Sequence, residues 1–216
     1  MKKLVYLSLG ILALASCKKA ALKVAENGCI SQIATPRLTG TDSITVAGLM
    51  KSNNLSTNNL VFYAYQTYNA LDQQNQMGDF QIADATYTQN GLPLFFYEED
   101  FGFENGVLNG PAPVNTQTVN LDANPTLSLQ RLRDSFLYQD KSVEYNPAIA
   151  LGLKDSCLSA EFGYYNLNID YPQKGVAIVK AWYVHPKNSQ WPQGYFRDDT
   201  GGAILFRPLT TAGNVP

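Results

Sequence analysis

Alternating apolar and polar residues mark two stretches of the chain and predict β-strands. Residues 60–68 read LVFYAYQTY, a run of aromatic and β-branched side chains that suits a strand covered on at least one face. Residues 79–108 hold two strand-like runs around an Asn-Gly pair at 90–91, and a second Asn-Gly pair follows at 105–106. Because Asn and Gly adopt positive φ at low cost, this pattern predicts a long β-hairpin.

The return strand of that hairpin repeats aromatic residues on one face. Phe95, Tyr97, Phe101 and Phe103 share their parity with Glu99. We expect this face to pack against other parts of the chain, except near Glu99.

Helical periodicity occurs twice. Residues 44–52 put Val46, Leu49 and Met50 on one side, after a Thr-Asp-Ser segment that can cap a helix. Residues 125–138 show a second helical pattern of leucines and Phe. Further strands are predicted at 29–33, 116–121, 156–167, 176–185, 194–199 and 203–206, and an exposed Gln/Asn loop at 71–78. A helix and strands recur in both halves, which predicts an α+β fold, with Gly/Pro punctuation at 109–114 as the boundary.

The N-terminus has the pattern of a bacterial lipoprotein signal peptide. Residues 1–16 combine two lysines with an apolar segment too short to span a bilayer, followed by Cys17. This ending resembles a lipobox, in which the cysteine thiol receives diacylglycerol. We expect a mature chain that begins at lipidated Cys17, a tether at 17–28, and anchoring to a membrane surface. An ordinary apolar helix with a chance cysteine is the alternative. Lys18 and Lys19 resemble the start of outer-membrane lipoproteins of Bacteroidetes-type bacteria.

Charge excludes one class of partner. Loss of Lys2 and Lys3 with the signal peptide leaves 16 − 2 = 14 basic residues against 18 acids, a mature net charge of 14 − 18 = −4. Lys18 and Lys19 form the only basic cluster, so nucleic acid is not an expected partner.

Two cysteines remain after lipidation. Cys29 and Cys157 can form one disulfide in an exported chain, which would tie the N-terminal segment to the second half. Two buried free thiols are the alternative. Neither a CxxC pair nor a Cys/His spacing for a metal occurs in the sequence.

Two motifs, in a fixed order, resemble a known family. Residues 90–95 read Asn-Gly-Leu-Pro-Leu-Phe, and Phe-Glu-Asn-Gly-Val follows at 103–107. This pattern resembles the fungalysin/thermolysin propeptide, which has Asn-Gly-Leu-Pro-Val-Phe, a strand, and then an Asp-Gly or Asn-Gly turn. Val-Lys-Ala-Trp-Tyr-Val at 179–184 and Tyr-Phe-Arg-Asp-Asp-Thr-Gly at 195–201 resemble the paired strands of a PepSY domain.

The resemblance implies a fold, a partner and a surface. The fold is two tandem cystatin-like (PepSY-like) modules at 29–110 and 111–216, each a helix packed on a curled antiparallel sheet. In that family the propeptide assists the folding of its protease and inhibits it. The partner expected here is therefore a secreted metalloprotease, and the hairpin turn supplies the candidate contact residues Asn90, Gly91, Leu92 and Pro93.

The sequence contains no recognisable catalytic, metal or cofactor constellation. His185 is the sole histidine and precedes Pro186, which favours an extended strand end over a catalytic role. The acids at 98–100 alternate between the two faces of a strand, and the Asp-Asp-Thr-Gly at 198–201 matches a hairpin turn better than a calcium loop. HExxH, GxSxG and phosphate-loop motifs are absent from the sequence. We therefore expect a non-enzymatic protein that needs no cofactor.

Trp191 is the aromatic residue best placed to meet a ligand. It lies in the polar loop 188–192 and would stack on a glycan or pack over a sheet edge. The predicted function is thus a cell-envelope lipoprotein that binds another protein by strand addition. The alternative is a glycan- or small-ligand-binding accessory lipoprotein of the outer membrane.

Overall fold

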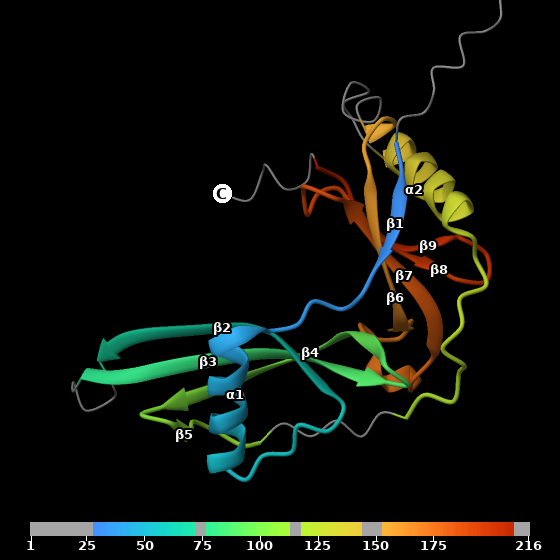
Figure 1. Ribbon diagram of the computed structural model, residues 1–216. Helices are drawn as coiled ribbons and strands as arrows, with labels where there is room; N and C mark the ends of the chain where they lie inside the picture. Colours follow the sequence, from blue (N-terminus) through green and yellow to red (C-terminus); the bar gives the residue numbers. More distant parts are fainter. Residues whose placement is uncertain (1–27, 72–76, 113–117, 144–152, 210–216) are drawn as a thin grey trace, which may run out of the picture.

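The computed structural model describes residues 28–71, 77–112, 118–143 and 153–209, and there the protein is a mixed α and β structure (Figure 1). One 9-stranded sheet carries the two α-helices of these ranges, so the α+β prediction is confirmed. The elements are β1 (Ile30–Ile33), α1 (Gly40–Ser52), β2 (Leu60–Leu71), β3 (Met77–Gln89), β4 (Leu92–Glu104), β5 (Val107–Leu108), α2 (Leu129–Val143), β6 (Leu158–Asn166), the 3-10 turn η1 (Pro172–Lys174), β7 (Ile178–Pro186), β8 (Gln193–Arg197) and β9 (Ala203–Arg207).

The first half is an antiparallel meander of β2, β3, β4 and β5. Both predicted Asn-Gly turns form. Asn90 and Gly91 have φ angles of 53° and 77°, and Asn105 and Gly106 have φ angles of 51° and 79°. Two successive positive φ angles give the hairpin turn whose twist matches that of the flanking strands. The hairpin prediction is confirmed.

Helix α1 covers one face of this meander (Figure 1). Val46 and Met50 are buried against residues of β3 and β4, as their helical spacing predicts. The helix begins at Gly40 rather than at residue 44, because Thr39 takes the extended conformation of an N-cap residue. The predicted capping segment 41–43 therefore forms the first turn, where the charge of Asp42 suits the helix dipole.

The second half is the antiparallel run of β6, β7, β8 and β9, covered on one face by α2 (Figure 1). Leu132 and Phe136 of α2 are fully buried and pack with Phe162, Trp182 and Phe196 of the sheet. Asp-Asp-Thr-Gly forms the turn between β8 and β9, which confirms its interpretation as a hairpin turn.

Strand β4 joins the two halves because it pairs with a strand of each. Its residues 92–93 and 98–104 pair with β3, and Leu94 and Phe95, which lie between these stretches, pair in parallel with Tyr164 and Tyr165 of β6. The register between β3 and β4 shifts at the same place. The sheet therefore continues from one half into the other.

The N-terminal strand lies with the second half, so the prediction that residues 29–33 belong to the first module is wrong. β1 pairs in parallel with β6, with Ile30 opposite Leu158. A disulfide joins Cys29 to Cys157, the residues immediately before these two strands. The backbone N–H of Leu158 also donates to the Cys29 carbonyl oxygen at 2.7 Å. β1 is thus a strand of the second half, and the chain then crosses to α1 in the first half.

Three other expectations need correction or lie outside the described residues. No strand forms at 118–121, because the Val119 N–H donates to the Gln89 side chain (2.9 Å) instead of a neighbouring strand. α2 begins at Leu129 rather than at residue 125, because Asp198 binds the preceding backbone. β2 and β3 extend into the predicted loop at 71–78, leaving 72–76 undescribed. The signal peptide 1–16, Cys17, most of the tether and positions 116–117 also lie outside the described ranges.

Neither helix in the described ranges is long and apolar enough to cross a membrane.

Candidate functional site

Each half of the sheet has a face that its helix does not cover. In the second half, Phe162 and Trp182 point toward α2, so the alternating residues lie on the opposite face. On that face Glu161 of β6 is opposite Tyr183 of β7, and Tyr183 is opposite Tyr195 of β8. The three strands therefore present a carboxyl group and two phenol rings in a row.

The first half contributes a matching face. Ala83, Ala85 and Phe101 pack on the α1 side, so Thr86 and Glu98, which are paired across β3 and β4, lie on the other side. The register of β2 shifts between Phe62 and Ala64, around Tyr63. Irregularities of this kind re-aim a side chain, and Tyr63 hydrogen-bonds the carboxylate of Glu98.

The two uncovered faces enclose a cavity of about 470 Å³, which we call the joint cavity. Its charged and aromatic lining residues are Tyr63, Phe95, Glu98, Glu161, Tyr183 and Tyr195, with Arg207 of β9 also in the wall. The volume lies within the range of about 300–1,000 Å³ that is usual for small-ligand pockets. Residues from β2, β4, β6, β7, β8 and β9 meet here, and the parallel β4–β6 pairing is what brings them together.

The aromatic side of the joint cavity is a connected set of rings. Tyr183 and Tyr195 have ring centroids 4.9 Å apart, and the Phe95 ring meets the Tyr195 ring edge-on at 5.3 Å. Tyr165 extends the set, with its centroid 5.1 Å from that of Tyr195. The Tyr183 hydroxyl donates a hydrogen bond to the Gln193 side chain. These contacts fix the rings in place, so a ligand would meet a preformed aromatic wall.

Burial and negative charge raise the pKa of the tyrosines in this wall. Burial first, and then nearby carboxylates led by Glu98, raise the pKa of Tyr63 to about 12. Burial is also the main reason that the pKa of Tyr183 and of Tyr195 is raised, and the charges of Glu161 and Glu98 add to the effect. The tyrosines therefore stay protonated at neutral pH and can donate hydrogen bonds.

Glu161 is the most unusual group in the joint cavity. Burial raises the pKa of its carboxyl group, against a hydrogen bond from Thr35 that lowers it. Its Oε1 atom is buried and has no hydrogen-bond partner among the described residues. A buried carboxylate oxygen without a donor is costly. Oε1 is thus a buried acceptor without a donor among the described residues, and it has no surface exposed to the cavity.

The predicted contact residues of the hairpin turn are used inside the molecule. The Asn90 side chain donates to the Leu121 carbonyl oxygen at 3.1 Å, and Leu92 packs against the core of the second half. Pro93 is buried and borders the joint cavity. A Cβ atom added at Gly163 would lie 2.6 Å from the Pro93 carbonyl oxygen. Strands β4 and β6 therefore approach each other so closely that only glycine fits at position 163. Gly91 at the tip stays exposed.

Trp191 lies apart from those residues. Its side chain is half-buried and lines a second cavity of about 450 Å³, with Leu153, Cys157 and residues 186–189. Its neighbour Gln190 belongs to the wall of the joint cavity. His185 sits at the end of β7, where its Nδ1 is 2.8 Å from the Pro186 carbonyl oxygen. This contact fits the predicted structural role.

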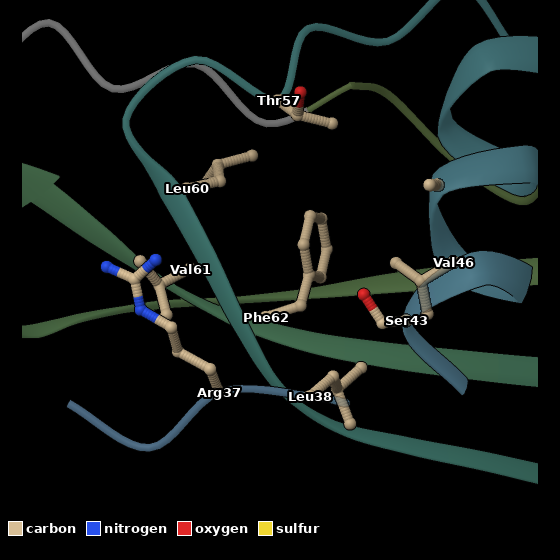
Figure 2. Close-up of a pocket in the computed structure, with 9 residues that line it drawn as sticks. Arg37, Leu38, Ser43, Val46, Thr57, Leu60, Val61 and Phe62 are labelled. Carbon is tan, nitrogen blue, oxygen red and sulfur yellow. The ribbon is translucent and has the colours of Figure 1, made fainter. Parts of the chain in front are cut away.

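A smaller cavity of about 240 Å³ lies between α1 and β2 (Figure 2). Leu38, Val46 and Phe62 lie around it, whereas the Arg37 side chain extends along the far side of β2 (Figure 2). Ser43 is the polar side chain that α1 contributes to the lining. Because polar groups do not converge here, this space is better explained as a gap in packing than as a site.

Sequence reasoning missed Glu161, Tyr63, Tyr183 and Tyr195 as a group. A signal was present, since Glu161 is the one charged residue in the apolar strand β6. In the parts of the chain that the structure describes, no group of three or more His, Cys, Asp or Glu side chains is placed to hold a metal ion.

Comparisons with known proteins do not assign a family. No protein-family model matches this chain, and no curated protein matches it.

Proposed function

We propose that this chain is a non-enzymatic lipoprotein of the cell envelope that binds another protein in trans. The partner is a secreted metalloprotease, which the chain inhibits or chaperones. Lipidated Cys17 anchors it to the outer membrane. The observation that carries the proposal is the edge of β2 beside the joint cavity, which no other strand of the described residues covers.

Strand β2 offers a template for strand addition. Among the described residues it pairs with β3 alone, and residues 66–69 are exposed. The Leu38 N–H donates to the Phe62 carbonyl oxygen at 2.7 Å. This contact uses the edge of β2 before Tyr63 and leaves the edge after Tyr63 open to a partner. Edge strands carry unpaired N–H and C=O groups that an extended segment of a partner can join. Since Tyr63 also lines the joint cavity, a segment added to β2 reaches that cavity with one end.

The arrangement of the helices supports the finer description of the fold. α1 packs on β3 and β4, and α2 packs on β6, β7 and β8, each within its own core cluster. We propose that these are two cystatin-like modules joined edge to edge through β4 and β6. The free edge of β2 is then the outer edge of the first module.

The partner is tested by capture. The full chain, purified with its lipid in detergent, is the bait, and the organism's secreted and envelope proteins are the prey, read by mass spectrometry. Specific recovery of a thermolysin-like peptidase supports the proposal. A reproducible set of partners that contains no peptidase refutes the assignment to a protease.

The mode of binding is tested at the edge of β2. Neighbouring residues of an edge strand point their N–H groups in opposite directions, so Gln66→Pro and Thr67→Pro form a matched pair. One of the two substitutions removes an N–H that bonds to β3, and the other removes an N–H that faces outward. We expect the variant that loses the outward-facing N–H to keep its thermal stability and to lose partner binding. If the more stable variant of the pair still binds the partner fully, strand addition at β2 is wrong.

A second function is favoured by one specific observation. The half-buried Trp191 ring lines its own cavity beside the sheet, which suits stacking on a glycan. In that case the chain is a glycan-binding accessory lipoprotein. A glycan array with wild type and Trp191→Ala tests this function. Equal signals from the two proteins on every glycan that binds would exclude Trp191 as the contact.

A further inference from the structure

The joint cavity has the chemistry of a cation site. Two carboxylates, Glu98 and Glu161, line it from opposite halves of the molecule. Arg207 is the one cationic side chain in the lining, and both Arg207 and Glu98 are exposed; with both carboxylates ionised the lining has a net charge of −2 + 1 = −1. Three tyrosine rings and one phenylalanine ring form the aromatic part of the wall. Aromatic faces attract cations through their quadrupole.

The two carboxylates of the lining decide what kind of ligand fits. A bound anion would add charge beside Glu98 and Glu161, and a neutral apolar group would offer them neither a positive charge nor a donor. An ammonium or guanidinium group supplies both a positive charge and N–H donors. The rings of Tyr183 and Tyr195 would then cover the alkyl part of the ligand.

We propose that the joint cavity binds an organic cation carried on an unbranched alkyl chain, such as the side chain of a partner's lysine. This inference rests on the proposed function where the cation belongs to a partner protein, because the cavity lies beside the edge of β2. The same ammonium chemistry is found in free polyamines. The two sources are separated by the choice of probe.

The test uses the full chain in detergent and measures dissociation constants by ligand-observed NMR. The probes are Nα-acetyl-lysine methylamide, its uncharged match Nα-acetyl-norleucine methylamide, and putrescine. We expect the lysine probe to bind about tenfold more tightly than the norleucine probe, as hydrogen bonds to a charged group allow. Tighter binding of putrescine than of the lysine probe would identify a free amine as the ligand. Equal binding of the lysine and norleucine probes would overturn the inference.

Variants test whether the preference for the lysine probe over the norleucine probe depends on Glu161. Glu161→Gln should bring the two amino-acid probes to nearly equal affinity. Glu99→Gln is the matched control, because it removes the same charge from β4 at a position that is not part of the cavity lining. Arg207→Gln changes an exposed residue that repels the ligand, so the lysine probe should bind about threefold more tightly and the norleucine probe should not change. A preference for lysine that survives Glu161→Gln, or that Arg207→Gln does not strengthen, contradicts the assignment.

These outcomes are independent of the capture experiment. If the lysine probe binds but no peptidase is captured, the cavity chemistry stands and the proposed partner is wrong. If a peptidase is captured and the lysine probe does not bind, the cation site alone is refuted.

Discussion

Replacement of Asp198 tests how α2 is attached to the sheet of the second half, because this buried carboxylate holds the start of α2 against the sheet. Its Oδ1 accepts hydrogen bonds from the Trp182 indole N–H at 2.9 Å and from the Leu127 backbone N–H at 3.0 Å. Its Oδ2 accepts from the Thr126 hydroxyl at 2.6 Å. Asp198 itself is 1% exposed. Asp198→Ala removes all of these acceptors at once.

The expected magnitude follows from the donors that would be left unpaired. The Trp182 indole and the Leu127 backbone lie in buried residues, whereas Thr126 is exposed and water can replace its partner. A buried donor without a partner costs about 1–3 kcal/mol. Two such donors predict a loss of about 2–6 kcal/mol in the free energy of unfolding. Asp198→Asn keeps one acceptor oxygen and should lose about half as much.

Urea unfolding followed by tryptophan fluorescence measures this loss. With a slope of about 2 kcal/mol per molar urea, the midpoint of Asp198→Ala should fall by about 1–3 M. Asp199→Ala is the control, because the Asp199 carboxylate is exposed and pairs with Arg197 on the surface, where ion pairs contribute little. If Asp198→Ala and Asp199→Ala have the same midpoint, the hydrogen bonds of Asp198 do not stabilise the fold as argued.

The same carboxylate predicts a dependence on pH. Burial raises the pKa of Asp198, but hydrogen bonds from Thr126, Leu127 and Trp182 outweigh it, and the folded pKa is lowered. A lowered folded pKa means that the unfolded chain binds the proton more readily. The contribution of Asp198 is therefore complete above the unfolded pKa of about 3.9, and it is lost as pH falls through the folded value. Between pH 5 and pH 3, about where this loss begins, wild type should lose more stability than Asp198→Asn.

Three further substitutions test the joint, the disulfide and the turn. Gly163→Ala puts a Cβ atom 2.6 Å from the Pro93 carbonyl oxygen and should lower the free energy of unfolding by about 1–3 kcal/mol, measured by urea unfolding. Serine at both Cys29 and Cys157 opens a link between residues 128 positions apart and should cost about 2–5 kcal/mol; an unchanged melting temperature would contradict this. Gly91→Ala meets no neighbouring atom and suffers only from its φ of +77°, so it should cost about 1–2 kcal/mol by the same assay, and a larger loss would point to contacts that the turn does not show.

Local chemistry explains what could be predicted from the sequence. The Asn-Gly turns have positive φ for reasons carried by those two residues alone, and the helical spacing of Val46 and Met50 identifies the face of α1 that packs. Errors arose where a distant residue decides the local structure. The Val119 N–H donates to the Gln89 side chain rather than to a strand. Asp198 accepts the Leu127 N–H, and α2 begins only after that residue. Such partners lie far away in sequence and leave no local pattern.

The joint cavity was beyond prediction for a related reason. The acids at 98–100 and the lone Glu161 of β6 were visible as residues, and strand alternation separates Glu98 from Glu99. The sequence does not contain the information that β4, besides pairing with β3, pairs in parallel with β6. That parallel pairing brings Glu98 and Glu161 to the same cavity.

The parallel pairing of β4 with β6 also explains why the Asn-Gly-Leu-Pro segment is a poor candidate for free contact. Leu92 and Pro93 pack against the second half, where Gly163 lets the strands approach. A segment buried in this way fixes the relative position of the two halves, and through it the width of the joint cavity. Substitutions in the turn should therefore change ligand binding through the shape of the cavity. By contrast, substitutions on the β2 edge should change partner binding while the lysine preference of the cavity stays the same. This difference separates the internal role of the hairpin from its role as a contact surface.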